Sequence, residues 1–413
     1  MSRLNELIRK LCPNGVEYKK LGEIATITRG GSFQKKDFTE TGIPCIHYGQ
    51  IYTRYKLFTN TTVSFLSETT AQKQKKAKTN DIIMAVTSEN IEDVCKCVAW
   101  LGNEDVAISG HTAIIHHKQD AKYLSYYFHS SMFFAQKKTL AHGAKVIEVT
   151  PDKLNEIIVP VPPLEIQKEI VKILDEFTDY LYWLKNELEA EIVARKQQYE
   201  FIRDKQLTFS EETEVKWVQL GEVATIARGA SPRPIKNFIT EQDDGVSWIK
   251  IGDVSPASKY ITSTKEKITA EGAKKSRRVK NGDFILSNSM SFGRPYIVRI
   301  DGCIHDGWLS ISNFESTMSS DYLYYILTSS SIQREMAKRA SFGGAVQNLN
   351  ADIVRSILIP VPTLDKQDRI VTLLDQLDSL CKGICNELDA EIYARQKQYE
   401  YFRDKLLNFE ESL

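Results

Sequence analysis

Residues 186–209 read NELEAEIVARKQQYEFIRDKQLTF, and residues 386–409 repeat this stretch as NELDAEIYARQKQYEYFRDKLLNF. The likeness extends back along the chain, where IIVPVPPLEIQ at residues 157–167 matches ILIPVPTLDKQ at residues 357–367. The two copies are much farther apart than the repeats of a solenoid protein. The sequence therefore predicts a duplicated unit, in which a globular domain precedes a long helix.

Each copy of the repeat has the pattern of one long helix of roughly 43 residues. The proline-rich PVPP and PVPT cannot lie inside a helix, so they mark its start. Apolar residues then recur at steps of four and three, as in a coiled coil, and a stripe of this kind needs a partner helix to cover it. In the first copy the stripe is Ile170, Leu174, Phe177, Leu181, Leu184, Leu188, Ile192, Tyr199 and Ile202; in the second it is Ile370, Leu374, Leu377, Cys381, Ile384, Leu388, Ile392, Tyr399 and Phe402.

The direction of the two helices follows from the segment that joins them. This segment has the size of one compact domain, and the ends of a domain usually lie close together. The end of the first helix should therefore lie beside the start of the second, which predicts an antiparallel pair. We expect one globular domain at each end of the pair, related by a pseudo-twofold axis.

The globular segments share a frame of glycines, strands and helices. The first opens with LGEIATITRGGS from Leu21 and the second with LGEVATIARGAS from Leu220, and both openings predict a strand that runs into a loop. Later strands are followed by a helix containing KYLSYYFHS or DYLYYILTS, whose tyrosines we expect in the core. A small-residue loop and a last strand, around residues 143–146 and 344–347, close each segment.

The predicted fold class is α+β, with two similar β-rich domains joined by two long antiparallel coiled-coil helices. An N-terminal amphipathic helical segment, with Leu4, Leu7, Ile8 and Leu11 on one face, precedes the first domain. The predicted boundaries are residues 1–15 for this segment, 16–156 for the first domain, 157–210 for the first long helix, 211–356 for the second domain and 357–413 for the second long helix.

Basic residues gather at equivalent places in the two halves, although the net charge of the chain is zero. The runs KQKKAK at residues 73–78 and KKSRRVK at residues 274–280 match in position, and glycine-rich loops before them also carry basic residues. Such runs are commonly just solvated faces. Their recurrence favours contacts with nucleic-acid phosphates. The candidate residues are Arg29, Lys35, Lys36, Lys73, Lys75, Lys76, Lys78, Lys145, Arg228, Arg233, Lys274, Lys275, Arg277, Arg278 and Arg294.

The sequence shows no pattern of a catalytic or metal centre. It has no GxxxxGK[ST] run, no GxSxG motif and no set of cysteines and histidines at zinc-ligand spacing, so we expect hydrogen-bonded or solvated histidines. The seven cysteines are scattered, and no apolar run is long enough to span a bilayer. The N-terminus has no apolar core of the kind that a signal peptide needs. We expect reduced cysteines, a cytoplasmic location and no contact with a membrane.

At this point the sequence resembles a known family. IPVPTLDKQ followed by a helix ending in ARQKQYEYFRDKLLNF is similar to the specificity subunits of type I restriction–modification systems, as are the LGE openings and the GDFILSNSMSFGRP loop. The likeness covers both halves. The first half departs from the pattern at Cys45 and His47, and in VTSEN, which lacks the glycines of the second half's loop.

The resemblance implies a role for each part of the chain. Each globular domain would be a target recognition domain that reads one half of a bipartite, gapped site in double-stranded DNA. The helices would set the gap and dock two methyltransferase subunits that use S-adenosylmethionine to methylate adenine. Restriction subunits driven by ATP and magnesium would add cleavage. This chain itself would be no enzyme and would hold no cofactor.

Two other readings remain open from the residues alone. One is a nuclease with a dispersed carboxylate site, which would cleave DNA with a divalent metal and no partner. The other is a coiled-coil scaffold that binds only protein, which would give a flat titration against DNA even with methyltransferase subunits present. The base sequence recognised depends on loop side chains that the sequence alone does not place.

Overall fold

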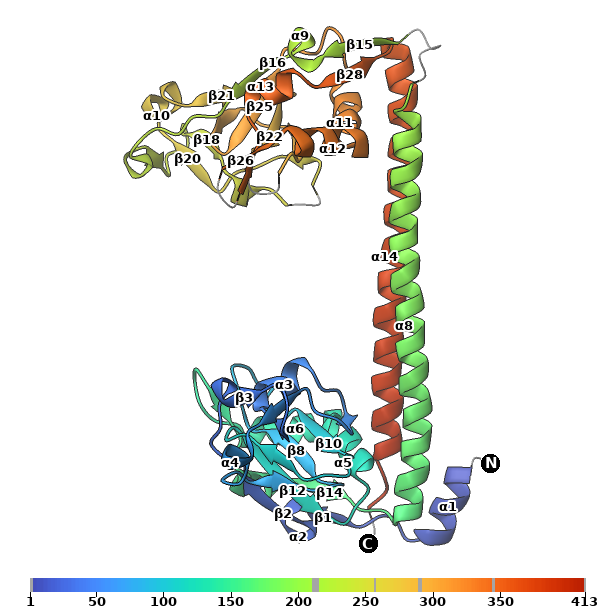
Figure 1. The fold of residues 1–413 in the computed structure, drawn as a ribbon. Coiled ribbons are helices and arrows are strands. Elements are labelled where there is room, and N and C mark those ends of the chain that lie inside the picture. Colours follow the sequence, from blue (N-terminus) through green and yellow to red (C-terminus); the bar gives the residue numbers. More distant parts are fainter. Residues whose placement is uncertain (1–2, 210–214, 256–257, 289–291, 344–345, 412–413) are drawn as a thin grey trace. The chain divides into compact units, whose positions relative to one another are not determined.

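The computed structural model describes residues 3–209, 215–255, 258–288, 292–343 and 346–411, with the backbone alone for residues 341–343 and 346–348. The chain divides into two compact units, shown with its elements in Figure 1. Unit 1 comprises residues 1–188 and 390–413, and unit 2 comprises residues 189–389. Two long helices, α8 (Leu164–Gln206) and α14 (Leu364–Leu407), each contribute one end to each unit.

Unit 1 contains two five-stranded mixed sheets. In both sheets every neighbouring pair is antiparallel except one, β10 with β5 in the first and β4 with β11 in the second. The first sheet has the order β2 (Ala25–Arg29), β12 (Thr112–His117), β8 (Ile82–Ala85), β10 (Cys97–Trp100) and β5 (Phe58–Thr59). The second has the order β3 (Phe38–Thr39), β6 (Ser64–Leu66), β4 (Ile43–Ile46), β11 (Val106–Ile108) and β7 (Lys76–Ala77).

Unit 2 repeats this topology strand for strand, including the positions of the parallel pairs. Its first sheet has the order β16 (Thr225–Arg228), β25 (Trp308–Ser312), β22 (Phe284–Ser287), β23 (Pro295–Val298) and β19 (Tyr260–Ile261). Its second has the order β17 (Ile239–Thr240), β20 (Glu266–Ile268), β18 (Val246–Ile249), β24 (Gly302–Ile304) and β21 (Arg277–Val279).

Short two-stranded ladders complete both units. In unit 1 they are β1 (Tyr18–Lys20) with β14 (Ile158–Pro160), and β9 (Thr87–Ser88) with β13 (Ile147–Glu148). In unit 2 they are β15 (Lys216–Gln219) with β28 (Leu358–Val361), and β26 (Ser341–Gly343) with β27 (Val346–Asn348). The predicted last loop of the second domain includes residues 344 and 345, which lie outside the described residues.

Short helices cover the sheets and connect their strands. In unit 1 they are α1 (Arg3–Leu11), α2 (Leu21–Ile24), η1 (Lys35–Asp37), α3 (Tyr48–Thr53), α4 (Glu68–Ala71), α5 (Ala121–Phe128), α6 (Ser131–Leu140) and α7 (Pro151–Leu154). In unit 2 they are α9 (Leu220–Val223), η2 (Ile235–Asn237), η3 (Ile251–Asp253), α10 (Ala270–Lys274), α11 (Ser320–Thr328), α12 (Ser330–Arg339) and α13 (Ala351–Arg355).

The central strand of each first sheet is buried on both faces. Ile82 and Met84 of β8 pack into the core that includes α5, α6 and α8, while Ile83 and Ala85 face the second sheet. In β22 the same alternation places Phe284 and Leu286 in one core and Ile285 in the other. Side chains of a strand alternate between its faces, so a strand between two layers needs apolar residues at every position. The continuous apolar runs of the sequence therefore form the strands β8 and β22, which lie between the two cores of each domain.

The prediction of a strand at LGEIATIT is wrong for its first four residues. Leu21–Ile24 forms the helical turn α2, and the strand begins only at Ala25. Leu21 is fully buried, its N–H donates to the carbonyl of Ile157 at 2.7 Å, and the Lys20 N–H donates to the Glu23 carboxylate at 3.1 Å. Unit 2 has the same turn, α9. Alternating apolar residues do not distinguish a strand from a single capped turn.

The tyrosine-rich helices lie where the sequence predicts them. Tyr123, Tyr126 and Tyr127 of α5 are buried, as are Tyr322 and Tyr325 of α11. A second helix follows each of them, α6 and α12, which the sequence analysis did not predict. The Ser130 hydroxyl caps α6 by accepting a hydrogen bond from the Phe133 N–H at 3.3 Å.

In unit 1, the start of α8 packs antiparallel to the end of α14. The Phe177 and Phe402 rings stack 6.2 Å apart, and the hydroxyls of Thr178 and Tyr399 lie 2.9 Å apart. Leu407 joins Ile170 and Leu174 in the domain core. The predicted stripe is therefore the contact face of the pair, although Phe177 keeps 44% of its surface exposed.

In unit 2, the end of α8 packs antiparallel to the start of α14. The Cys381 thiol lies 3.6 Å from the Arg195 carbonyl, and Ile202 and Leu377 line the same groove. Leu207 of the chain after α8 enters the core with Ile370 and Leu374. The antiparallel prediction is confirmed within both units.

A buried glutamine fastens each domain to its long helix. The fully buried Gln167 accepts a hydrogen bond from the Asp120 N–H at 2.9 Å and donates to the Pro162 carbonyl and the Gln119 side chain, both at 2.8 Å. Gln367 repeats the arrangement in unit 2. It accepts from the Ser319 N–H at 3.0 Å and donates to the Thr317 and Pro362 carbonyls at 2.9 Å. One amide therefore joins the start of the helix, the proline turn and the helix cap of the domain.

We expect Gln167→Ala to loosen this joint. Each buried backbone group left without a partner costs about 1–3 kcal/mol, because it has lost water as well as its hydrogen bond. Faster hydrogen exchange around residues 119–124 would report the loss. Gln197→Ala, at an exposed glutamine of the same helix, is the matched control and should leave that exchange unchanged. Equal exchange in both variants would contradict a role for this amide in the joint.

Candidate nucleic-acid interface

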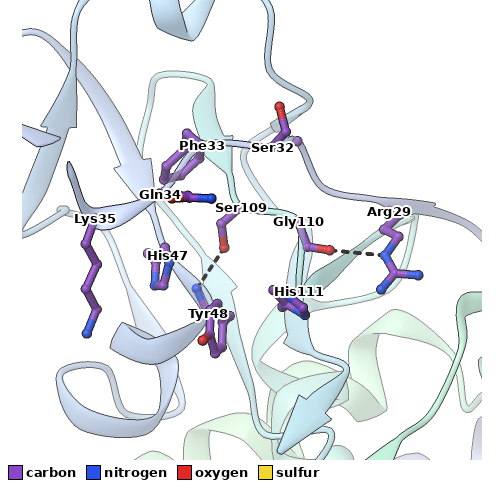
Figure 2. Close-up of a pocket in the computed structure, with 11 residues that line it drawn as sticks. Arg29, Ser32, Phe33, Gln34, Lys35, His47, Tyr48, Ser109, Gly110 and His111 are labelled. Atoms are coloured by element: carbon purple, nitrogen blue, oxygen red, sulfur yellow. Dashed lines mark hydrogen bonds between the residues drawn. The ribbon is translucent and has the colours of Figure 1, made fainter. Parts of the chain in front are cut away.

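An open cavity lies at the same place in the fold of each unit, between the loop after the first edge strand and the second sheet. The cavity of unit 1 has a volume of about 620 Å³ and is shown in Figure 2. Its lining residues are Arg29, Gly31, Ser32, Phe33, Gln34, Lys35, His47, Tyr48, Ser109, Gly110 and His111. The cavity of unit 2 has a volume of about 760 Å³. Its lining residues are Ser231, Pro232, Arg233, Ile235, Lys236, Ile239, Trp248, Lys250, Ile251, Gly252, Glu266, His305 and Asp306.

The backbone of the glycine loop is held in the same way in both cavities. The Gly30 N–H donates to the Thr112 carbonyl at 3.0 Å, and in unit 2 the Gly229 N–H donates to the Trp308 carbonyl at 2.8 Å. A Cβ atom on Gly30 would lie 2.0 Å from the Ser109 carbonyl, and one on Gly229 would lie 2.0 Å from the His305 carbonyl. Only glycine permits this close approach of two backbone segments.

Two further hydrogen bonds occur at equivalent positions in both cavities. The Arg29 Nε donates to the Gly110 carbonyl at 3.1 Å, as Figure 2 shows, and the Arg228 Nε donates to the Asp306 carbonyl at 3.3 Å. The Tyr48 N–H donates to the Ser109 hydroxyl at 2.8 Å.

In unit 2 the corresponding Ile251 N–H donates to the His305 ring at 3.2 Å. Ser109 and His305 therefore accept the equivalent backbone hydrogen bond, one with a hydroxyl and the other with an imidazole ring. The two cavities share one backbone frame and differ in the groups that line it.

Aromatic rings dominate the cavity of unit 1. The His47 ring lies 4.5 Å from the Tyr48 ring, which lies 5.0 Å from the His111 ring. Burial, with smaller effects of Lys35 and His111, lowers the pKa of His47, so this histidine is neutral at physiological pH. Its Nδ1 accepts a hydrogen bond from the Gly49 N–H at 3.2 Å, which leaves Nε2 to carry the proton as a donor.

The cavity of unit 2 combines one indole with charged pairs. Lys250 forms an ion pair with Glu266. The Ser231 hydroxyl donates to Asp306 at 2.7 Å, and Arg233 approaches the other carboxylate oxygen at 3.3 Å. The hydrogen bond from Ser231 is the main cause that lowers the pKa of Asp306, so this carboxylate is ionised at physiological pH. Trp248 supplies an apolar wall.

The two basic runs lie beside these cavities. In unit 1 the Ser32 N–H of the glycine loop donates to the Gln74 side chain at 2.8 Å. In unit 2 the Ser276 hydroxyl donates to the Ala230 carbonyl of the equivalent loop at 2.6 Å. Both runs form an edge strand of the second sheet, β7 or β21. The predicted contact residues in these runs are all exposed: Lys73, Lys75, Lys76, Lys78, Lys274, Lys275, Arg277 and Arg278.

The remaining predicted residues are spread more widely. Arg29 and Lys35 line the cavity of unit 1, and Arg233 lines that of unit 2. Arg29 also forms an ion pair with Glu148 at 3.0 Å, which brings the loop carrying the exposed Lys145 to the same side. Lys36 and Arg228 are exposed, whereas Arg294 is half-buried before β23. These assignments as DNA contacts stay predictions.

Most of the lining residues were not predicted from the sequence, among them Tyr48, Ser109, Trp248, Lys250 and Asp306. Their signal was present in the duplication. HYGQ corresponds to KIGD through the shared Gly49 and Gly252. SGHT corresponds to HDGW through the contacts of Gly30 with Ser109 and Thr112 and of Gly229 with His305 and Trp308. The histidines in these segments were expected to be hydrogen-bonded or solvated, and His47 and His305 each accept a hydrogen bond from a backbone N–H.

Comparison with known proteins identifies the family. The model of the type I restriction modification DNA specificity domain matches residues 13–194 and 212–394. The chain belongs to this family. It is 34% identical to the EcoR124I/EcoR124II specificity subunit of Escherichia coli over 60% of this chain and 61% of that protein. A putative type I specificity subunit of Haemophilus influenzae is 31% identical over 65% of this chain and 68% of its own length.

Two solved structures show the same fold at 17% identity. A chain from a study of complex assembly and conformational transition of a type I R-M system gives a TM-score of 0.76 and covers 96% of this chain and 98% of its own. The HsdS subunit of Thermoanaerobacter tengcongensis gives a TM-score of 0.57, with 96% and 97% covered. The family model confirms the predicted family and its duplicated layout, and the two structures confirm the predicted two-domain fold.

Among the described residues, no cluster of histidine, cysteine or acidic side chains has the arrangement of a metal site. No helix among them has the length and apolar character to cross a bilayer.

We expect replacement of Lys274, Lys275, Arg277 and Arg278 by alanine to weaken DNA binding across sequences. Each lost phosphate contact should reduce the slope of log affinity against log salt concentration by about 1. Lys275 also pairs with Glu271 at 2.8 Å, so a separate Lys274 and Arg278 double variant avoids disturbing that contact. Binding titrations at several salt concentrations, with the assembled complex, provide the measurement.

Lys216→Ala removes an exposed charge from β15 and serves as the control. An unchanged salt slope in the basic-run variants would instead assign these residues to protection of the sheet edge, where lysines discourage pairing with other strands. Increased aggregation of the variants would support that alternative.

Proposed function

We propose that this chain is the DNA-reading subunit of a type I restriction–modification complex, and that each globular domain reads one half of a bipartite site. The observation that carries the proposal is the pair of cavities on one backbone frame with unlike linings. A shared frame with different side chains suits two ligands of one class and different sequence. Exposed basic residues on the neighbouring edge strands suit the phosphates of the same duplex.

We infer that the long helices dock two methyltransferase subunits. In unit 1 the helix surfaces expose Tyr180, Trp183 and Tyr401 at 57%, 54% and 62%. In unit 2 they expose Phe201 and Leu380. Large aromatic side chains are enriched in protein–protein interfaces, where they supply much of the binding energy.

The chemistry belongs to the partner subunits in this proposal. S-adenosylmethionine would bind to the methyltransferase subunits, and ATP and magnesium to restriction subunits where these are present. Methylation of adenine and cleavage of DNA would then need the assembled complex, in the cytoplasm where the DNA is. Radiolabelled methyl transfer by the pure chain alone would contradict this division.

Exchange of one domain tests the reading of half-sites. We expect replacement of residues 16–156 by the equivalent segment of a relative to change one half of the methylated sequence and leave the other half unchanged. The lining residues of the first cavity all lie in the exchanged segment. Methylation-site sequencing of host DNA, with the gene present, exchanged and deleted, gives the result. A change in both halves would contradict independent reading.

The length of the helices should set the gap between the half-sites. A seven-residue insertion after Ala190 keeps the apolar stripe in phase and adds about 10 Å of helix. This corresponds to at most roughly three base pairs of additional gap at ~3.4 Å per base pair. The half-site sequences should stay the same. A two-residue insertion rotates the stripe out of phase and should impair assembly. If the longer insertion alters a half-site but not the gap, the helices do not measure it.

A further inference from the structure

Asp306 is the clearest chemical difference between the two cavities. Its equivalent in unit 1 is Gly110, because the carbonyls of both residues accept a hydrogen bond from the arginine that ends the first strand of the sheet. The described residues that line the cavity of unit 1 include no aspartate or glutamate. In unit 2 a carboxylate side chain projects from the same backbone position.

The Asp306 carboxylate keeps capacity to bind a ligand. Its side chain is 42% exposed, and its partners are the Ser231 hydroxyl at 2.7 Å and the more distant Arg233 at 3.3 Å; the His305 Nδ1 lies 3.7 Å away, beyond hydrogen-bonding distance. Arg233 is itself 82% exposed and is not held on a buried surface. An ionised carboxylate has two oxygens with about four acceptor sites, so two hydrogen bonds do not fill it. The other carboxylate of the cavity, Glu266, is matched by Lys250.

A negative charge here has a cost if DNA is the ligand. It lies beside the exposed basic run and would repel phosphates. Such a group is compatible with tight binding where it accepts a hydrogen bond from a base. The only donors on base edges in the major groove are the amino groups of cytosine and adenine. Adenine presents its N7 acceptor next to the amino group, and that acceptor would repel the second carboxylate oxygen. The amino group of cytosine has an acceptor on one side only, O6 of the paired guanine, whereas that of adenine has N7 on one side and O4 of the paired thymine on the other.

We propose that Asp306 is a specificity-determining residue that accepts a hydrogen bond from the exocyclic amino group of a cytosine in the half-site read by unit 2. This inference rests on the proposed function and names the base that one cavity selects. Unit 1, with Gly110 at this position, makes no equivalent contact. The half-site of unit 2 therefore contains at least one C·G pair that depends on Asp306.

The test is methylation-site sequencing with the full chain co-expressed with its methyltransferase subunit. We expect Asp306→Asn to relax one cytosine position in one half-site and to admit adenine there, because an amide can pair with the amino group and N7 of adenine. Discrimination at that position should fall about 5- to 150-fold. Asp306→Ala should lose the preference without gaining a new one. The other half-site should be unaffected.

The control is Asp301→Asn, at an exposed carboxylate of the same domain that accepts a hydrogen bond from the Asn281 N–H at 2.9 Å. It should read the wild-type sequence. Arg233→Ala tests whether Asp306 contacts the cytosine directly or acts through Arg233. For a direct contact we expect weaker DNA binding and an unchanged recognition sequence. The inference is overturned if Arg233→Ala reproduces the change of base, if Asp306→Asn keeps the wild-type site, or if that site has no C·G pair in the relevant half. Absence of any sequence-specific methylation by the wild-type complex would instead contradict the proposed function.

Discussion

The joint between each domain and its long helix is the constraint on which the structure depends. A proline turn, a buried glutamine and the cap of a tyrosine-rich helix meet there, and their backbone groups would otherwise be buried without partners. Gln167 and Gln367 satisfy these groups with three hydrogen bonds each. Tyrosines add to the joint. The Tyr123 hydroxyl donates to the Pro160 carbonyl at 3.1 Å, and the Tyr322 hydroxyl donates to the Pro360 carbonyl at 3.0 Å.

The next turn of each helix extends the same contact. Tyr126 donates a hydrogen bond to Asp175 at 2.8 Å, and Tyr325 makes the equivalent bond to Asp375. Buried networks in which every member is satisfied hold one arrangement, because any shift leaves a polar group unpaired. Within one unit, the domain and the adjoining part of the helix therefore form one rigid body. A reading domain needs this property, since its cavity must keep a fixed orientation relative to the helix that bears it.

The sequence predicted the elements whose signals are local or repeated. The long helices follow from their proline starts and apolar steps, and their antiparallel contact follows from the size of the connecting segment. The turn at Leu21–Ile24 was predicted wrongly because its cause is distant in sequence: Leu21 is held by the carbonyl of Ile157, which lies beside it in space but near the other end of the domain's sequence. The cavity was also beyond local analysis. Ser109 and Tyr48 are separated by some sixty residues and meet only because β4 and β11 pair in parallel.

The basic residues, by contrast, were found by charge alone, and charge does not distinguish a ligand-binding face from a protected sheet edge. The lining of the cavities is constrained in a different way. The Tyr48 N–H and the Ile251 N–H need an acceptor in both units, and a serine hydroxyl serves in one and a histidine ring in the other. The shared backbone thus requires a hydrogen-bond acceptor at this position and does not require one particular residue type. Asp306 goes beyond that requirement, because its side chain is 42% exposed and belongs to none of the hydrophobic cores of unit 2. Shortening a partly exposed side chain of this kind costs little stability, so a domain can change the bases that it binds and keep its fold.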